Sequence, residues 1–276
     1  MPGSSSTTEQ PPPEVLRAFG ATGVPHRLPG GQGTTWQCGD LVLKPRDMPA
    51  HALDWLAGEV APRLRSGEIR AALPLPARSG GFEIGGWTAF PALPGSHLPG
   101  RWLDIIAAGR RFSDLCAGVS EPSFIRARTD AWARGDRIAW GEETVAQVEA
   151  VPEIARIRSV LQPVEDTPTL VHGDLTGNVL FHDDLPPAII DLSLYWRPAA
   201  YASAIVVVDA ITFEGAPTGL VQTAATAPAF GQYLLRAIVF RLATDSLTGR
   251  SGPGGPSAYR RAIDSTLAFL GSGFPC

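Results

Sequence analysis

The chain has 276 residues, more than the roughly 100 to 200 of a usual single domain, so one large domain or two unequal lobes are expected. Hydrophobic residues make up 44% and charged residues 18%, a globular balance that excludes a wholly disordered chain. The formal net charge is −4 and the pI is about 5.7, so no basic footprint indicates binding to nucleic acid or to an anionic membrane.

Three widely spaced cysteines, Cys38, Cys116 and Cys276, form neither a CxxC pair nor a zinc-ligand cluster, so neither a disulfide framework nor structural zinc is expected. Residues 1–13 are rich in Ser, Thr and Pro and lack the pattern of a signal peptide, which predicts a disordered lead-in. The longest apolar run, 204–211, is too short to span a bilayer and contains an aspartate. A cytoplasmic location is expected, and the oligomeric state stays open.

The first elements in chain order form a strand-rich segment. A glycine-rich turn at 29–33 leads into a predicted hairpin, with strands at 34–38 and 41–44 joined by Gly39-Asp40. The second strand ends in Lys44. Helical spacing of apolar residues then predicts a helix over about 51–64.

The pattern changes after residue 90. Aromatic and β-branched residues in 82–90 predict strands around a Gly85-Gly86 turn, and the Pro/Gly-rich stretch 91–95 breaks them. We therefore expect a small strand-rich lobe to about Pro94 and a larger helical lobe after it. The helical patterns of the second lobe lie at 102–115, 132–140, 145–157 with an interruption at Pro152, 200–213, 230–242 and 258–270, and a mobile loop is expected at 249–255.

The centre of the chain, 169–191, reads as strand, loop, strand, turn, strand. Asp174 and Asn178 lie on the loop, and Asp191 ends the last strand. Phosphoryl transfer needs a group that orients the acceptor hydroxyl, and oxygen ligands that hold magnesium against the phosphates. Because Mg²⁺ accepts one or two protein oxygens together with phosphates and water, Asn178 and Asp191 suit it.

These motifs also carry a resemblance. The run His172-Gly-Asp174, followed by Asn178-Val-Leu-Phe and then Ile-Ile-Asp191, resembles the catalytic and metal-binding loops of the aminoglycoside phosphotransferase and choline kinase-like families. The similarity extends from about Leu16 to Leu270 and is strongest over 171–191. It implies the bilobal protein kinase-like fold of α+β class, a catalytic role for Asp174, and Asn178 and Asp191 as magnesium ligands.

The same resemblance implies an ATP site in the first lobe. Lys44 would contact the phosphates, paired with Glu59 on the predicted helix. The loop above the phosphates would contain Gly30, Gly31 and Gly33, and the hinge that receives adenine would run from Phe90 to Leu93. Other interpretations stay open, because a plain hairpin turn uses the same glycines, Lys44 suits an edge strand, and surface helices commonly carry glutamates.

The chain departs from the pattern of these families in three places. The step from Asp174 to Asn178 is four residues, where the families usually have five. Asp191 is followed by Leu-Ser, where Asp-Phe-Gly is usual. The second aspartate that many members carry is replaced by Ser203 and Ala204, and Asp209 is the nearest substitute.

Together these observations predict a lead-in at 1–13, an ATP-binding lobe at 14–94, and a catalytic and substrate lobe at 95–276. The expected function is transfer of the γ-phosphoryl of ATP, with Mg²⁺, to a hydroxyl of a small acceptor such as an aminoglycoside, an amino sugar or a choline-like amine. A catalytically impaired, nucleotide-binding regulatory protein is the alternative. A true protein kinase is disfavoured because His-Arg-Asp, Asp-Phe-Gly and Ala-Pro-Glu do not occur.

An aspartate cluster, a histidine and an arginine are also interpreted from their surroundings. Clustering of Asp174, Asp183, Asp184 and Asp191 would create an acidic cleft that suits cationic acceptors. His172 is interpreted as structural, satisfied by backbone groups of the loop. Arg197 invites a role with phosphate or an acidic substrate, although its aromatic neighbours also suit the lobe interior.

Overall fold

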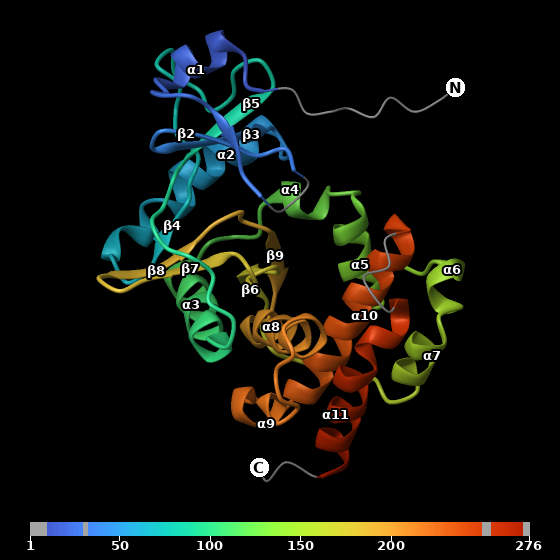
Figure 1. Cartoon of the computed structure of the whole chain (residues 1–276). Helices are drawn as coiled ribbons and strands as arrows, with labels where there is room; N and C mark the ends of the chain where they lie inside the picture. The colour runs from blue at the N-terminus through green and yellow to red at the C-terminus, as the bar shows by residue number, and fades with distance from the viewer. Residues whose placement is uncertain (1–9, 30–32, 250–254, 273–276) are drawn as a thin grey trace. The chain divides into compact units, whose positions relative to one another are not determined.

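The computed structural model describes residues 10–29, 33–249 and 255–272 (Figure 1). It divides into two compact units, the first running to Ser96 and including Leu180–Asp191, and the second formed by His97–Val179 and the chain from Leu192 onward. Most of the predicted lead-in lies outside the described residues, and its last residue, Pro13, begins helix α1. The centre of the expected loop at 249–255 lies outside them as well.

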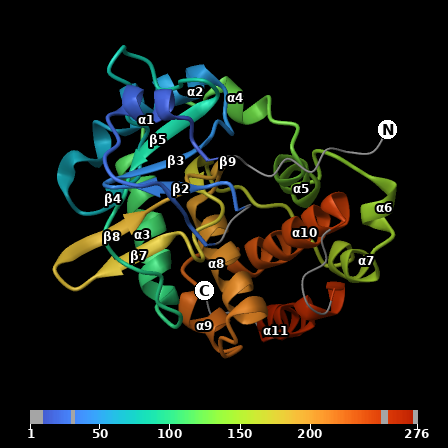
Figure 2. The same ribbon diagram turned by 45° about the horizontal axis from the view of Figure 1, so that its top comes forward.

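The first unit contains a four-stranded antiparallel sheet of order β1-β2-β3-β5. The predicted hairpin is confirmed, with Cys38 opposite Leu41 across the Gly39-Asp40 turn. Figures 1 and 2 show α1 beside this sheet, and its Val15 packs into the sheet's apolar core. The elements are α1 Pro13–Phe19, β1 His26–Arg27, β2 Trp36–Cys38, β3 Leu41–Pro45 and β5 Trp87–Pro91.

The turn before β5 shows why two adjacent glycines are needed. Gly85 and Gly86 have φ values of 57° and 81°, so both central positions are left-handed, as a type I′ hairpin turn requires. Ile84 and Trp87 close the turn with two mutual backbone hydrogen bonds of 2.9 Å. The turn predicted at this point is confirmed.

The helix expected over 51–64 is present but changes its hydrogen-bonding pattern along its length. It begins as α2 Ala50–Trp55, continues as a π-helical stretch η1 Leu56–Val60, and ends in a 3₁₀ turn η2 Arg63–Ser66. The Ala61 amide donates to the Leu56 carbonyl at 2.9 Å, a bond across five residues. Because a π-turn contains more residues than an α-turn, side chains after Leu56 point in directions that α-helical spacing does not predict.

A second sheet of the first unit has the order β4-β8-β7. Strand β4, Arg70–Ala71, pairs in parallel with β8, Leu185–Ile189, and β7 spans Val179–His182. Arg70 ties the sheet to the preceding chain, because its guanidinium donates to the carbonyls of Pro186 at 2.8 Å and Pro94 at 3.0 Å. The sequence predicted β7 and β8 but not the two-residue β4.

The second unit is mainly helical, and its longest helices match the predicted regions. Pro152 begins α7 at its first turn, where its missing N–H costs nothing, which confirms the predicted interruption. The helices are α3 Trp102–Leu115, α4 Ser123–Arg126, α5 Ala131–Ala139, α6 Ala146–Glu149, α7 Pro152–Arg158, α8 Ala199–Phe213, α9 Leu220–Ala224, α10 Phe230–Thr248, η3 Gly255–Tyr259 and α11 Arg260–Gly271. The mixed α+β class, strand-rich first and helical afterwards, is confirmed.

Helices α8 and α10 form the centre of this unit (Figure 1). Residues 201–211 of α8 are all buried, and the helix packs against α3, α10 and α11. A helix that is apolar on all sides belongs in an interior, and α8 therefore serves as a platform for the elements around it. Within the described residues, each helix is too short or too polar to cross a membrane.

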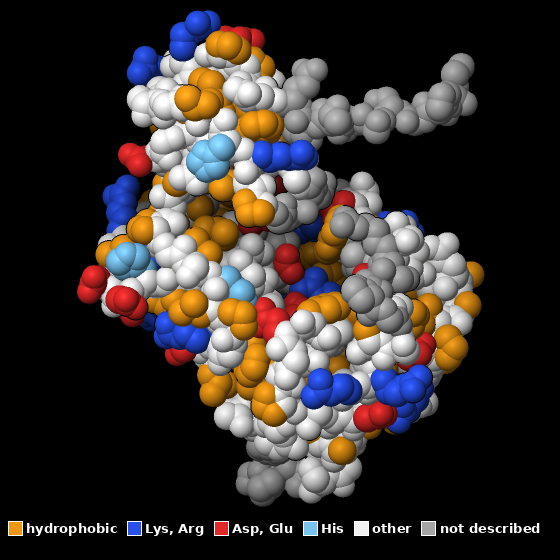
Figure 3. Space-filling view, viewed as in Figure 1, with side chains coloured by type: hydrophobic (Ala, Val, Ile, Leu, Met, Phe, Trp, Pro, Cys, Tyr) orange, Lys and Arg blue, Asp and Glu red, His pale blue; other side chains and the backbone are white. Residues whose placement is uncertain are grey.

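Charged side chains are mixed on the surface. On the face shown in Figure 3, basic and acidic side chains are interspersed and do not gather into one basic stripe. The expectation that the chain does not bind nucleic acid stays a prediction.

Helix α5 approaches α10 closely at Gly135, which gives a test of this packing. A Cβ at this position would lie 2.4 Å from Thr244 Oγ1 and 3.1 Å from the Phe240 carbonyl. Gly135→Ala is therefore expected to destabilise the protein by about 1 to 3 kcal/mol, because the backbone of α10 must move away. Thermal unfolding followed by circular dichroism measures the change.

Gly58→Ala is the matched control. No atom lies within 4 Å of a Cβ added there, and the helical backbone favours alanine over glycine by up to about 1 kcal/mol. The control should melt at an equal or higher temperature than the wild type. Equal melting temperatures for Gly135→Ala and the wild type would contradict the close approach of α5 and α10.

Candidate active site

The loop that carries Asp174 is anchored by a short antiparallel ribbon in the second unit. Strand β6, Thr169–His172, pairs with β9, Leu194–Arg197, so that His172 lies opposite Leu194. The Gly173 amide continues the ladder by donating to the Ser193 carbonyl at 2.8 Å. A Cβ on Gly173 would lie 2.5 Å from the ring of the buried Tyr195, so only glycine fits here without displacing the loop.

The loop is closed by bonds among its own residues. The Asp174 amide donates to Nδ1 of the buried His172 at 3.0 Å, which agrees with the structural interpretation of this histidine. The Asn178 side-chain amide donates to the Asp174 carbonyl at 2.7 Å, and its nitrogen lies 3.4 Å from Asp174 Oδ2. The short step between Asp174 and Asn178 is thus a compact turn. It directs the amide nitrogen of Asn178 inward and leaves the amide oxygen as the acceptor end.

A side chain that the sequence did not indicate also contacts Asp174. Arg241 on α10 donates to Asp174 Oδ1 at 2.7 Å and to both oxygens of Asp209 on α8. In the sequence, Asp209 is the nearest substitute for the second aspartate that the resemblance leads one to expect. The structure shows that Asp209 reaches the Asp174 loop through Arg241, which lies 67 residues beyond Asp174, a separation that no local motif could reveal.

In the first unit, Lys44 binds two carboxylates. Its Nζ lies 2.7 Å from Asp47 Oδ2 and 2.8 Å from Asp191 Oδ1, and 5.2 Å from the centre of the Phe90 ring. Burial lowers the pKa of this amine, but Asp47 and Asp191 outweigh burial, so the net pKa is raised and the ammonium stays charged. Because β3 lies between β2 and β5, the interpretation of Lys44 as an edge-strand lysine is wrong.

Lys44 is also the only lysine among the 23 Lys and Arg residues of the chain. The other 22 of these residues are arginines, whose guanidinium is planar and suited to forked contacts, whereas an ammonium is a compact point charge. The single side-chain ammonium of the chain therefore lies where two carboxylates converge.

Asp191 adopts an unusual backbone conformation. It follows β8 with φ of 48°, the only positive φ of a non-glycine residue in the described part of the chain. Left-handed backbone at a residue with a side chain costs energy, although aspartate tolerates it better than most. Such strain commonly marks a functional position, and here it orients the carboxylate that Lys44 contacts.

The glycine-rich loop lies between β1 and β2 in the chain, and the expected hinge spans the end of β5. Gly30 and Gly31 lie outside the described residues, while Gly33 has a φ of 67° and its carbonyl accepts a bond from Arg27. Phe90 lies in β5 opposite Val42 of the central strand β3. Leu93 lies just beyond the end of β5.

The expected pair between Glu59 and Lys44 is not formed. Glu59 contacts Arg63, with 3.6 Å between the nearest charged atoms, and its side chain is 52% exposed. The π-helical stretch η1 changes the direction in which Glu59 points, and two nearer carboxylates already satisfy Lys44.

The candidate residues thus form two groups. Lys44 and Asp191 meet within the first unit, and Asp174 and Asn178 meet within the second. Asp183 and Asp184 lie in the exposed turn between β7 and β8 of the first unit. The acidic cleft expected from these aspartates stays a prediction.

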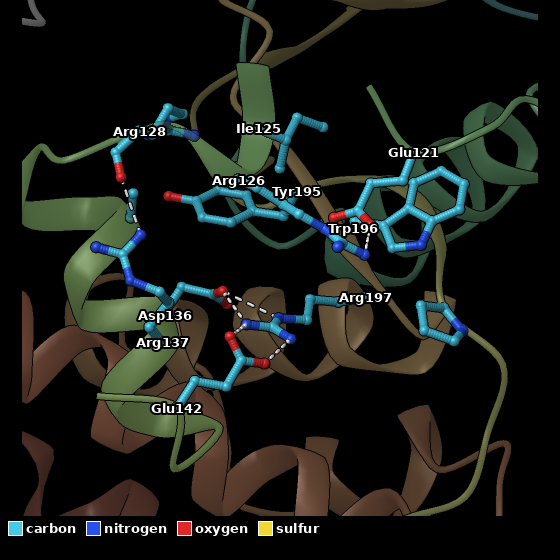
Figure 4. A pocket seen from close by; sticks show the side chains of 12 residues that line it. Glu121, Ile125, Arg126, Arg128, Asp136, Arg137, Glu142, Tyr195, Trp196 and Arg197 are labelled. Carbon is cyan, nitrogen blue, oxygen red and sulfur yellow. Dashed lines mark hydrogen bonds and ion pairs between the residues drawn. The ribbon is translucent and has the colours of Figure 1, made fainter. Parts of the chain in front are cut away.

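A pocket of about 510 Å³ opens in the second unit beside β9 (Figure 4). Tyr195, which covers Gly173, forms one wall and so connects the pocket to the loop that carries Asp174. The lining residues are Glu121, Ile125, Arg126, Arg128, Ala133, Asp136, Arg137, Glu142, Pro168, Tyr195, Trp196 and Arg197.

Arg197 organises one side of this pocket. Figure 4 shows Asp136 and Glu142 both bonded to its guanidinium, with N···O distances from 2.5 to 3.0 Å. Its Cζ lies 4.6 Å from the Trp140 ring centre. Arg197 is therefore held by two carboxylates and an aromatic face, which fixes the wall of the pocket.

Comparison with known proteins identifies the fold of the chain. No family model and no curated protein matches the sequence. Among solved structures, an aminoglycoside phosphotransferase from Alicyclobacillus acidocaldarius is similar with a TM-score of 0.63 at 15% identity, over 98% of this chain and 97% of that one. The chain has the fold of the small-molecule phosphotransferases. The kinase-like fold that the motifs implied is confirmed.

Two further neighbours show the range of this fold. The choline kinase of Streptococcus pneumoniae matches with a TM-score of 0.61 at 10% identity, over 92% of this chain and 97% of that one. A spectinomycin phosphotransferase, solved with ADP and spectinomycin, matches with a TM-score of 0.58 at 14% identity, over 93% and 97%. At these identities the likeness establishes the fold alone.

Proposed function

We propose that this chain is an ATP-dependent kinase that transfers the γ-phosphoryl group to a hydroxyl of a small molecule. The observation that carries the proposal is the loop in which Asp174, held at its backbone by His172 and Asn178, leaves its side chain 43% exposed. In a fold shared with small-molecule kinases, an oriented, accessible carboxylate at this position is suited to receive an acceptor hydroxyl.

In the proposed reaction, Asp174 accepts a hydrogen bond from the acceptor hydroxyl and directs it toward the γ-phosphorus. Phosphoryl transfer passes through a loose transition state, so most of the catalysis comes from positioning. The hydroxyl proton moves to the Asp174 carboxylate late, as the new O–P bond forms and the bond to ADP breaks.

The phosphates of the nucleotide are assigned to Lys44 of the first unit, and its Mg²⁺ to Asn178 and Asp191. Lys44 would contact the phosphates, and to reach them its ammonium would break its ion pair with either Asp47 or Asp191. Asn178 and Asp191 would hold Mg²⁺, and their amide and carboxylate oxygens are the donors this ion prefers; when bound, it neutralises phosphate charge. We place the protein in the cytoplasm, where ATP is available.

For the acceptor, we propose an alcohol that also carries an amine. Solved neighbours include kinases named for choline, aminopropanol and spectinomycin. The pocket beside β9 is the proposed seat of this molecule, because Trp196 supplies an aromatic face for a cation and Tyr195, whose ring is already covered by Arg128, connects the pocket to Gly173.

A regulatory protein that binds nucleotide without turnover is the second candidate. Its support is the altered segment after Asp191 and the short loop before Asn178. Against it stands the retention of Asp174, Asn178, Asp191 and Lys44, a set that a scaffold has no physical need to keep. Magnesium-dependent consumption of ATP in the presence of candidate amino alcohols separates the two.

Nucleotide binding can be tested on the single lysine. Bound Mg·ATP is expected to slow reductive methylation of Lys44 by ~10-fold or more at saturation, because phosphate contacts withdraw the amine from the reagent. The N-terminal amine, modified in the same reaction and quantified by peptide mass spectrometry, is the internal control. Equal modification of Lys44 with and without Mg·ATP would remove it from the nucleotide site.

Catalysis is tested by two isosteric substitutions that should impair different properties of the enzyme. Asp174→Asn removes the proton acceptor, so kcat should fall by ~10²-fold or more while nucleotide affinity changes little. Asp191→Asn weakens a metal ligand, so turnover and the magnesium dependence of nucleotide binding should both suffer. Steady-state kinetics and magnesium titrations measure these effects, with intrinsic ATP hydrolysis as the reaction until an acceptor is found. Wild-type turnover by Asp174→Asn on a true acceptor would disprove the mechanism.

A further inference from the structure

Arg241 joins the catalytic loop to the buried centre of the second unit. Its Nη2 lies 2.7 Å from Asp174 Oδ1 and 2.5 Å from Asp209 Oδ2, and its Nε lies 2.9 Å from Asp209 Oδ1. One guanidinium therefore holds the Asp209 carboxylate by a fork and reaches Asp174 with the same terminal nitrogen. The two helices that supply Arg241 and Asp209 are the buried α10 and α8.

Burial separates the roles of the two carboxylates. The side chains of Asp209 and Arg241 are 5% and 12% exposed, whereas that of Asp174 is 43% exposed. Burial lowers the pKa of Arg241, but Asp209 and Asp174 outweigh burial and raise the net pKa well above its ordinary value, so the guanidinium stays charged. Asp209 thus anchors Arg241 inside the protein, and Arg241 presents a fixed positive group to the outer carboxylate.

Aromatic packing fixes the arrangement further. The Arg241 Cζ lies 5.0 Å from the Phe240 ring centre, and that ring meets Tyr195 edge to face at 5.7 Å. Tyr195 in turn covers Gly173, the residue before Asp174. The guanidinium and the loop it contacts are therefore supported by the same continuous packing, which limits movement of one relative to the other.

We propose that Arg241 is a positioning residue for Asp174. It holds Oδ1, so that Oδ2, which among the described residues has only the long 3.4 Å contact with Asn178 Nδ2, is the oxygen presented to the acceptor hydroxyl. Asp209 holds Arg241 in place for this task. The inference rests on the proposed function, in which Asp174 receives the hydroxyl. A bond at one oxygen restricts rotation of the carboxylate, and small misplacements of such groups cost large factors in rate.

The competing explanation is that Arg241 only neutralises Asp209 in the protein interior. Both explanations predict lost stability when Arg241 is replaced, because a buried aspartate is left without its partner. They differ in how the loss of turnover depends on Asp174. A positioning residue acts through Asp174, whereas a structural residue acts whether or not Asp174 is intact.

The test is a double-mutant cycle of Arg241→Gln with Asp174→Asn, read as kcat for magnesium-dependent ATP hydrolysis and for any acceptor found. Arg241→Gln alone should lower kcat by ~10-fold or more and change the KM for ATP by less than ~2-fold. In the Asp174→Asn background, the same change should alter kcat by less than ~2-fold. Arg241→Lys, which keeps the charge, should recover part of the loss, and it replaces Arg241→Gln in the cycle if the latter does not fold.

Arg236→Gln is the matched control on the same helix. Arg236 is 6% exposed and donates to the carbonyls of Gln232 and Gln162, away from Asp174. This variant should lose melting temperature as Arg241→Gln does while keeping kcat within ~2-fold of the wild type. Equal loss of kcat in both Asp174 backgrounds, or an equal loss in Arg236→Gln, would overturn the role of Arg241. Wild-type turnover by Asp174→Asn would instead overturn the catalytic role of Asp174, and absence of magnesium-dependent turnover in the wild type would overturn the proposed function itself.

Discussion

The antiparallel pairing of β6 with β9 is the constraint on which the Asp174 loop depends. This ladder fixes His172 and Gly173, and it places Tyr195 against the glycine so tightly that no side chain fits there. The backbone conformation of the loop after Gly173 is then restricted, because the Asp174 amide donates to His172 and the Asp174 carbonyl accepts from Asn178. A carboxylate held by its own backbone in this way loses little conformational entropy on meeting a substrate.

Helices α8 and α10 supply the ion pair that contacts the loop after β6. A buried aspartate such as Asp209 is costly unless it is paired and hydrogen-bonded, and Arg241 supplies both of its oxygens with donors. The same guanidinium reaches out to Asp174. In the first unit, Lys44 plays a comparable part, since it neutralises Asp191 at a strained backbone position. In each unit, a cationic side chain thus holds one carboxylate in place, Lys44 holding Asp191 and Arg241 holding Asp174.

The parts that sequence could predict are those whose chemistry is local. Asp174, Asn178 and Asp191 lie within 18 residues of one another in a pattern of short strands and turns, and the hairpin before Lys44 follows from alternation and a Gly-Asp turn. Arg241 could not be found in this way, because α10 reads as an ordinary buried helix and its contact with Asp174 spans 67 residues. The direction of Glu59 was missed for a different reason, a π-helical turn that spacing alone does not signal.

The proposed function assigns Asp174, Asn178, Asp191 and Lys44 to one magnesium nucleotide. A crystal structure of the protein with Mg²⁺ and a non-hydrolysable ATP analogue is the decisive measurement. We predict that oxygens of Asn178 and Asp191 bind the same ion at about 2.0 to 2.1 Å, with Lys44 on the phosphates and Asp174 facing the γ-phosphate. A nucleotide bound elsewhere, or an ion that contacts neither Asn178 nor Asp191, would contradict the proposed nucleotide site.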